Sequence, residues 1–145
     1  MVKQIYEIFE EVEKAPTLQD RAAILHYNDT QALHMVLRGA FHPGIRYLIK
    51  KIPLYKPSDS PRGMGYTSIY KELGRIYLFE EGHPRRPAGL TNARMNTILI
   101  QMLEAMEAKE AIVFSNMLLK NLRVKNLNED AIKLAYPHKW HDILG

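Results

Sequence analysis

Apolar side chains recur at intervals of three and four residues along most of this chain, a spacing that places them on one face of an α-helix. Residues that commonly cap helix N-termini precede these stretches. The caps that we predict are Thr17, Asn28 or Asp29, Thr67, Thr91 and Asn128. Alternating apolar and polar runs, which would indicate strands, are nearly absent. The pattern therefore predicts an all-α fold of six to eight helices.

The helices that we expect are separated by two stretches rich in proline and glycine, residues 53–66 and 82–89. The expected helices cover residues 2–14, 17–26, 29–41, 67–81, 91–106, 108–119 and 128–136, with a short helical segment at 45–52. Their apolar faces include Ile112 and Leu134, which we expect to point inward. No composition shift divides the chain, so we expect one domain over residues 1–145.

The composition excludes several classes of protein. No apolar run approaches the roughly 20 residues that span a bilayer, and no secretory signal precedes the first helix, so we expect no membrane association. The chain has no cysteine, which removes disulfides, thiolate nucleophiles and cysteine-based metal sites. A reducing compartment such as the cytoplasm suits this composition.

Positive charge is concentrated in one part of the chain. Residues 31–75 hold 8 lysines and arginines against 2 acidic residues, whereas residues 1–30 hold 3 against 6. Because lysine and arginine attract phosphates, the distribution favours an anionic partner such as DNA, with an ordinary solvated face as the alternative. The candidate DNA-binding residues are Arg38, Arg46, Lys50, Lys51, Arg85, Arg86, Lys120, Arg123, Lys125 and Lys133.

Signatures of catalysis and of cofactor binding are missing. The chain has neither a glycine-rich phosphate loop nor a nucleophile elbow. Adjacent carboxylates such as Glu10 and Glu11 point to different sides of a helix and cannot act together. His138 and His141 are three residues apart but have no third ligand nearby in the sequence. We therefore expect no enzymatic activity, no cofactor and no metal.

Two blocks of the sequence resemble a known family. The first covers residues 17–51, with the run Ala23-Ile24-Leu25, then Asn28, Leu33 and Val36, and the ending Tyr47-Leu48-Ile49-Lys50-Lys51. The second covers residues 120–137, with Lys120-Asn121-Leu122-Arg123-Val124-Lys125, then Ala131 to Leu134 and Pro137. Together they resemble the N-terminal DNA-binding domain of ATP-dependent DNA ligases of the T-even bacteriophage type. They are also similar to small stand-alone proteins of tailed phages.

The resemblance implies an all-α domain that grips the backbone and minor groove of duplex DNA, nicked or intact, with little sequence preference. The matched contact positions are Lys50, Lys51, Arg123 and Lys133. Where the family has an aspartate and a glycine, this chain has Asn121 and Lys125. The catalytic domains of a ligase are absent, so the resemblance implies a non-enzymatic phage protein acting in the host cytoplasm. The alternative is an interaction module that binds and inhibits or redirects a host or phage protein.

Overall fold

The computed structural model describes residues 3–145, and the regular elements of this part of the chain are all helices, with no strand. Eight α-helices and one 3₁₀ helix, η1, follow one another. They are α1 (Ile5–Lys14), α2 (Leu18–Tyr27), α3 (Gln31–Phe41), α4 (Ile69–Glu72), η1 (Leu73–Phe79), α5 (Asn92–Ala105), α6 (Ala108–Leu118), α7 (Glu129–Ala135) and α8 (Trp140–Leu144). The expected all-α fold is confirmed.

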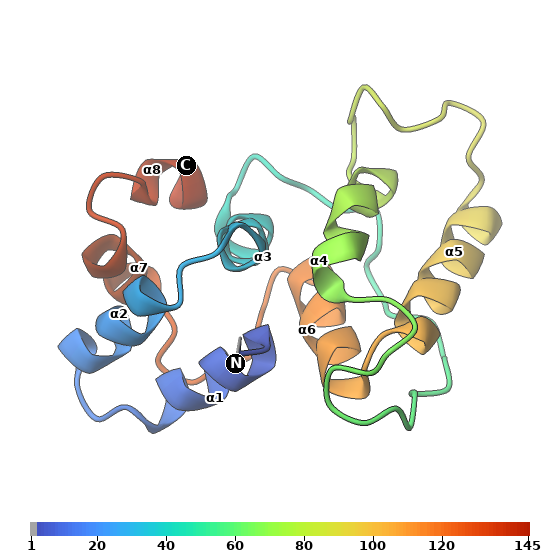
Figure 1. Ribbon diagram of the computed structural model, residues 1–145. Coiled ribbons are helices and arrows are strands. Elements are labelled where there is room, and N and C mark those ends of the chain that lie inside the picture. The colour runs from blue at the N-terminus through green and yellow to red at the C-terminus, as the bar shows by residue number, and fades with distance from the viewer. Residues whose placement is uncertain (1–2) are drawn as a thin grey trace.

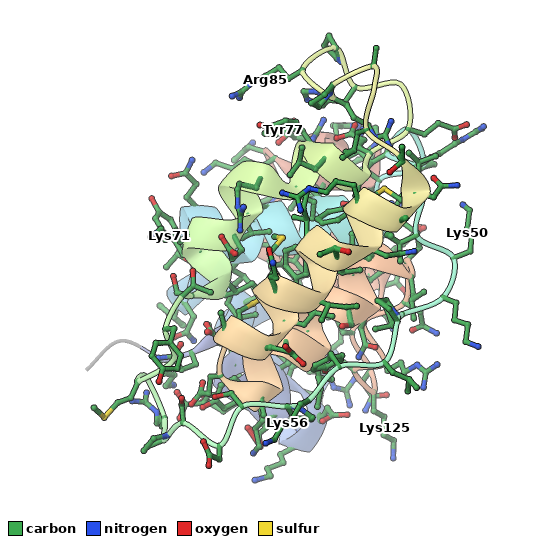
Figure 2. The ribbon with its side chains drawn as sticks, turned by 90° about the vertical axis from the view of Figure 1, so that its right-hand side faces the viewer. Lys50, Lys56, Lys71, Tyr77, Arg85 and Lys125 are labelled. Atoms are coloured by element: carbon green, nitrogen blue, oxygen red, sulfur yellow. The ribbon has the colours of Figure 1, made fainter. Side chains whose placement is uncertain are left out.

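Helix α6 lies at the centre of the fold, where it packs against α1, α3, α4 and α5 (Figure 1). Its Phe114 and Met117 are fully buried. Helices α2, α7 and α8 lie on one side of this centre, and α4 and α5 lie on the other. In the view onto α5, Lys71 and Lys50 lie on opposite edges of the molecule (Figure 2). These two edges carry the surfaces considered below.

Helix starts follow the predicted caps in three cases out of five. The side chains of Thr17, Thr91 and Asn128 each accept a hydrogen bond from the backbone N–H three residues later. Helix α3 is instead capped by Thr30, which accepts from the Leu33 N–H at 3.2 Å. The expected Asn28 cap was wrong because Asn28 ends α2, where its side-chain amide donates to the Ile24 carbonyl. Ser68, not Thr67, caps α4, since the Ser68 hydroxyl accepts from the Lys71 N–H at 3.2 Å.

The expected helical segment at residues 45–52 was wrong. Tyr47 and Glu80 form an isolated antiparallel bridge. On either side of it, the Leu48 N–H donates to the Phe79 carbonyl and the Glu81 N–H to the Arg46 carbonyl, both at 2.7 Å. Long-range pairing with the end of η1 therefore keeps residues 45–49 extended.

Three smaller expectations also need correction. Ile112 and Leu134 point outward, with 52% and 48% of their surfaces exposed. The expected helix at residues 67–81 is divided into the short α4 and the tighter η1. Helix α8 follows Pro137, where we expected the helices to end.

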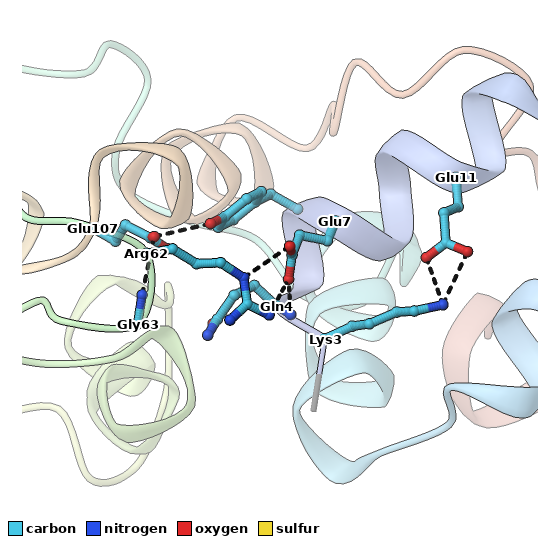
Figure 3. Close-up of polar contacts among 8 residues, drawn as sticks. Lys3, Gln4, Glu7, Glu11, Arg62, Gly63 and Glu107 are labelled. Carbon is cyan, nitrogen blue, oxygen red and sulfur yellow. Dashed lines mark hydrogen bonds and ion pairs between the residues drawn. The ribbon is translucent and has the colours of Figure 1, made fainter. Parts of the chain in front are cut away.

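Residues 53–67 form a strap that crosses from the extended segment to α4. Its Arg62 guanidinium donates to both carboxylate oxygens of Glu7 on α1, at 2.9 and 2.6 Å (Figure 3). The Glu107 carboxylate accepts from the Tyr6 hydroxyl at 2.9 Å and from the Gly63 N–H at 3.2 Å (Figure 3). Hydrogen bonding from Arg62 holds the pKa of Glu7 at about 2, compared with its ordinary 4.5. The strap is therefore fastened to α1 and to the start of α6 although it has no regular structure.

Candidate nucleic-acid interface

Lys120 joins two segments that are far apart in the sequence. It lies just after α6, in the connector of residues 119–128 that leads to α7. Its ammonium group donates to the carbonyls of Gly39 and His42, both at 2.8 Å, and lies 5.5 Å from the centre of the Tyr47 ring. Burial lowers the pKa of Lys120 to about 8. Lys120 thus fastens the connector to the end of α3 and to the extended segment.

Two hollows lie on either side of Lys120 and share it in their walls. One, of about 230 Å³, is also lined by Arg46 and Lys50 from the extended segment. The other, of about 150 Å³, is also lined by Asn121 and Arg123 from the connector. The described residues contribute no acidic side chain to either lining. We call the four cationic residues Arg46, Lys50, Lys120 and Arg123 the basic rim.

The connector presents Arg123 from a constrained backbone. Lys120, Arg123 and Asn126 have positive φ angles of 61°, 56° and 69°, a region that costs most residues about 1 kcal/mol. The Asn121 side chain accepts from the Arg123 N–H at 3.0 Å, which stabilises the turn. Lys125, where the expected resemblance implied a glycine, is not among the residues of positive φ. The connector therefore does not need a glycine at that position.

Several predicted cations belong to the rim or adjoin it. Arg46, Lys50 and Arg123 are exposed there, and Lys51, next to Lys50 in the chain, is exposed as well. Lys125 is exposed at the end of the connector, where its backbone N–H donates to the Glu13 carboxylate at 3.0 Å. In Figure 2, Lys50 lies at the right edge of the molecule and Lys125 at its lower right. The structure thus brings together cations from residues 46–51 and from the connector, which are far apart in the sequence.

Two other predicted cations have partners within the fold. The Arg86 guanidinium donates to the Leu78 carbonyl at 2.9 Å. The Arg38 guanidinium donates to the Asp142 carbonyl at 3.1 Å and lies 3.8 Å from the Asp142 carboxylate. Like Lys120, these side chains hold neighbouring segments together.

Arg85 and Lys133 lie away from the rim, each against an aromatic ring. Arg85 lies 4.6 Å from the centre of the Tyr77 ring, and Lys133 lies 4.8 Å from the centre of the Trp140 ring. The loop that carries Arg85 and the helix that carries Lys133 are at opposite ends of the molecule in Figure 1. The predicted set therefore does not form one continuous surface.

Replacing Lys120 by methionine should destabilise the protein by about 2 kcal/mol, because two backbone carbonyls lose a charged donor. Methionine retains most of the aliphatic stem, so the decrease in the free energy of unfolding measures the contribution of the ammonium group. Urea unfolding followed by circular dichroism measures it, with Lys109→Met on the exposed side of α6 as the control. Equal stability of the two variants would show that the Lys120 bonds contribute little.

Another hollow, of about 650 Å³, lies between the start of α3 and residues 138–142. His34, His138, His141 and Asp142 are among its lining residues, and His34 Nε2 lies 2.6 Å from an Asp142 carboxylate oxygen. Across residues 3–145, no three acidic or histidine side chains are placed to hold a metal ion. His138 and His141 are thus near other polar groups without forming a metal centre in the described chain.

Comparison with known proteins places the chain in a family. None of the described helices is both long and apolar enough to span a bilayer. No curated protein matches the sequence. A family of unknown function, DUF6433, has a sequence model that matches residues 8–125, which is most of the chain. This protein therefore belongs to the DUF6433 family.

Proposed function

We propose that this protein binds duplex DNA through the phosphate backbone, without catalysis and with little sequence preference. One observation carries the proposal. Arg46 and Lys50 line one hollow, Arg123 lines the other, and Lys120 lines both. Through the resemblance to phage ligase domains, we further propose that it is a phage protein acting in the cytoplasm of the infected cell.

The exposed charge around the rim suits phosphate contacts. Arg46, Lys50, Lys51 and Arg123 are exposed, and no acidic side chain among the described residues lines the two hollows between them. Cations in this arrangement attract successive phosphates and release counterions from the duplex. Such contacts position a protein on DNA without reading bases.

Among the described residues, the basic rim contains neither a helix nor a β-ribbon. Its cations come from residues 46–50 and from the irregular connector, whereas base readout in the major groove commonly uses a helix or a paired β-ribbon. Low sequence preference follows from this arrangement.

Fluorescence anisotropy with two labelled duplexes of unrelated sequence, each about two helical turns long, tests the proposal. At about 50 mM salt we expect micromolar or tighter binding that differs little between the sequences. Nicked versions of both duplexes, titrated in parallel, show which form is preferred. Absence of binding to all four duplexes would contradict the proposal.

The second candidate function is an interaction with a host or phage protein. A hollow of about 380 Å³ between α2 and α7 is lined largely by small and apolar residues, including Ala23, Tyr27, Leu134 and Pro137. Tyr27 is 84% exposed at its edge. Exposed apolar surface of this kind is common where proteins meet.

Capture from nuclease-treated host lysate tests this second candidate. We expect a stoichiometric protein that is retained by the wild type and lost with Leu134→Glu. A partner retained equally by both, or no partner, would contradict a role for this hollow.

A further inference from the structure

Helix η1 follows directly after α4 in the chain. Together they have one buried side and one exposed side. Ile69, Leu73 and Phe79 lie in the core, with 3%, 2% and 0% of their surfaces exposed. The opposite side faces solvent on the edge of the molecule that carries Lys71 in Figure 2. We call this opposite side the α4–η1 face.

Two tyrosines lie along this face with an open gap between them. Tyr70 is 60% exposed, and Tyr77 is half-buried. Seven residues separate them, which corresponds to about 12 Å at the rises of α and 3₁₀ helices and brings both to similar sides. Gly74 lies between them, and beyond its own helix no atom lies within 4 Å of the position that its Cβ would take. The centre of the Tyr77 ring lies 5.5 Å from that of the His83 ring, so Tyr77 is partly covered and Tyr70 is the more open ring of the two.

The exposed charge on this face is positive. Lys71 is exposed next to Tyr70, and the exposed Arg85 lies 4.6 Å from the centre of the Tyr77 ring. In Figure 2, Lys71 lies at the left edge of the molecule, and Tyr77 and Arg85 lie at its top. The acidic residue of α4, Glu72, is 4% exposed, and its carboxylate accepts from Arg75 at 2.7 Å.

We propose that the α4–η1 face binds single-stranded nucleic acid. Unpaired bases stack on tyrosine rings, and cations interleaved with the rings attract the phosphates between them. An arginine already placed over a ring provides a second planar surface for a base. Bases in a duplex are stacked on one another, so this face favours a single strand. It is distinct from the basic rim, since Lys50 and Lys71 lie on opposite edges in Figure 2.

Anisotropy of a labelled 20-nucleotide oligothymidylate tests the proposal on the full chain at about 50 mM salt. We expect wild-type binding that Tyr70→Ala weakens about tenfold and that Tyr70→Phe retains within about threefold, because the ring supplies the stacking. Arg85→Ala should weaken binding less, because the stacking rings remain. Tyr70 is exposed, so circular dichroism should show the same fold and melting in its variants.

Tyr27→Ala is the matched control, because Tyr27 is an exposed tyrosine on α2, at the other end of the molecule. It should leave oligothymidylate affinity unchanged. No binding by the wild type, or equal losses from Tyr70→Ala and Tyr27→Ala, would overturn the proposal. The proposal would also be overturned if a protein partner bound through Tyr70 and oligothymidylate did not bind. Failure of duplex binding alone bears on the proposed function and leaves this inference intact.

Discussion

Replacing Gly65 by alanine should destabilise the protein by about 3 kcal/mol, because the new Cβ has no room. It would lie 2.8 Å from the Glu107 backbone nitrogen, 3.0 Å from the Thr67 carbonyl oxygen and 3.2 Å from that of Ala105. All three are backbone atoms, which cannot rotate away as the end of a side chain can. The Thr67 N–H also donates to the Ala105 carbonyl at 3.1 Å, so the strap cannot move off without losing that bond.

Thermal unfolding measures this effect, and a loss of about 3 kcal/mol corresponds to roughly 10 °C for a domain of this size. Gly89→Ala is the matched control, since Gly89 is an exposed loop glycine with nothing within 4 Å of its Cβ position. We expect its melting temperature to stay close to that of the wild type. If Gly65→Ala has the same melting temperature as Gly89→Ala, the close packing of the strap against the turn between α5 and α6 is refuted.

Reversing two charges of the rim and one beside it, as Lys50→Glu, Arg123→Glu and Lys51→Glu together, should weaken duplex binding by about a hundredfold or more at low salt. Each exposed cation is expected to replace counterions at one phosphate, and a carboxylate in its place repels that phosphate. The loss should be alike for unrelated sequences, because these contacts read no bases. Anisotropy titrations of the same two duplexes measure it.

A control variant must carry the same change in net charge. Lys14→Glu, Lys109→Glu and Lys139→Glu together meet this requirement, since all three lysines are exposed and none lines the two hollows of the rim. We expect this variant to bind within about tenfold of the wild type. Equal losses in the two triple variants would show that overall charge, and not the rim, attracts the duplex.

Most of the helices could be predicted from the sequence, and three of their starts follow the predicted caps. Thr17, Thr91 and Asn128 each bond to an N–H three residues away, and local sequence is enough to indicate such a cap. The extended residues 45–49 depend instead on η1, about 30 residues later in the chain, so helical spacing misled the prediction. The alternation of buried Ile45, Tyr47 and Ile49 with exposed Arg46 was present in the sequence as a weaker signal.

The candidate site could be predicted only in outline. Charge density indicated the basic segments, but it could not separate exposed cations from those with partners inside the fold. Lys120 and Arg86 bond to carbonyls through tertiary contacts that leave no trace in local sequence. The α4–η1 face was missed because we considered basic residues without the tyrosines near them, although Tyr70 and Tyr77 have the spacing of one helical face.

The salt dependence of duplex affinity tests the central claim most directly. Four exposed cations, Arg46, Lys50, Lys51 and Arg123, are available for phosphates. Four phosphate contacts predict that the logarithm of the association constant falls with the logarithm of salt concentration with a slope between about −3 and −4. The same titration on the rim variant should give a slope closer to zero. A wild-type affinity that is independent of salt between about 50 and 200 mM would contradict the account.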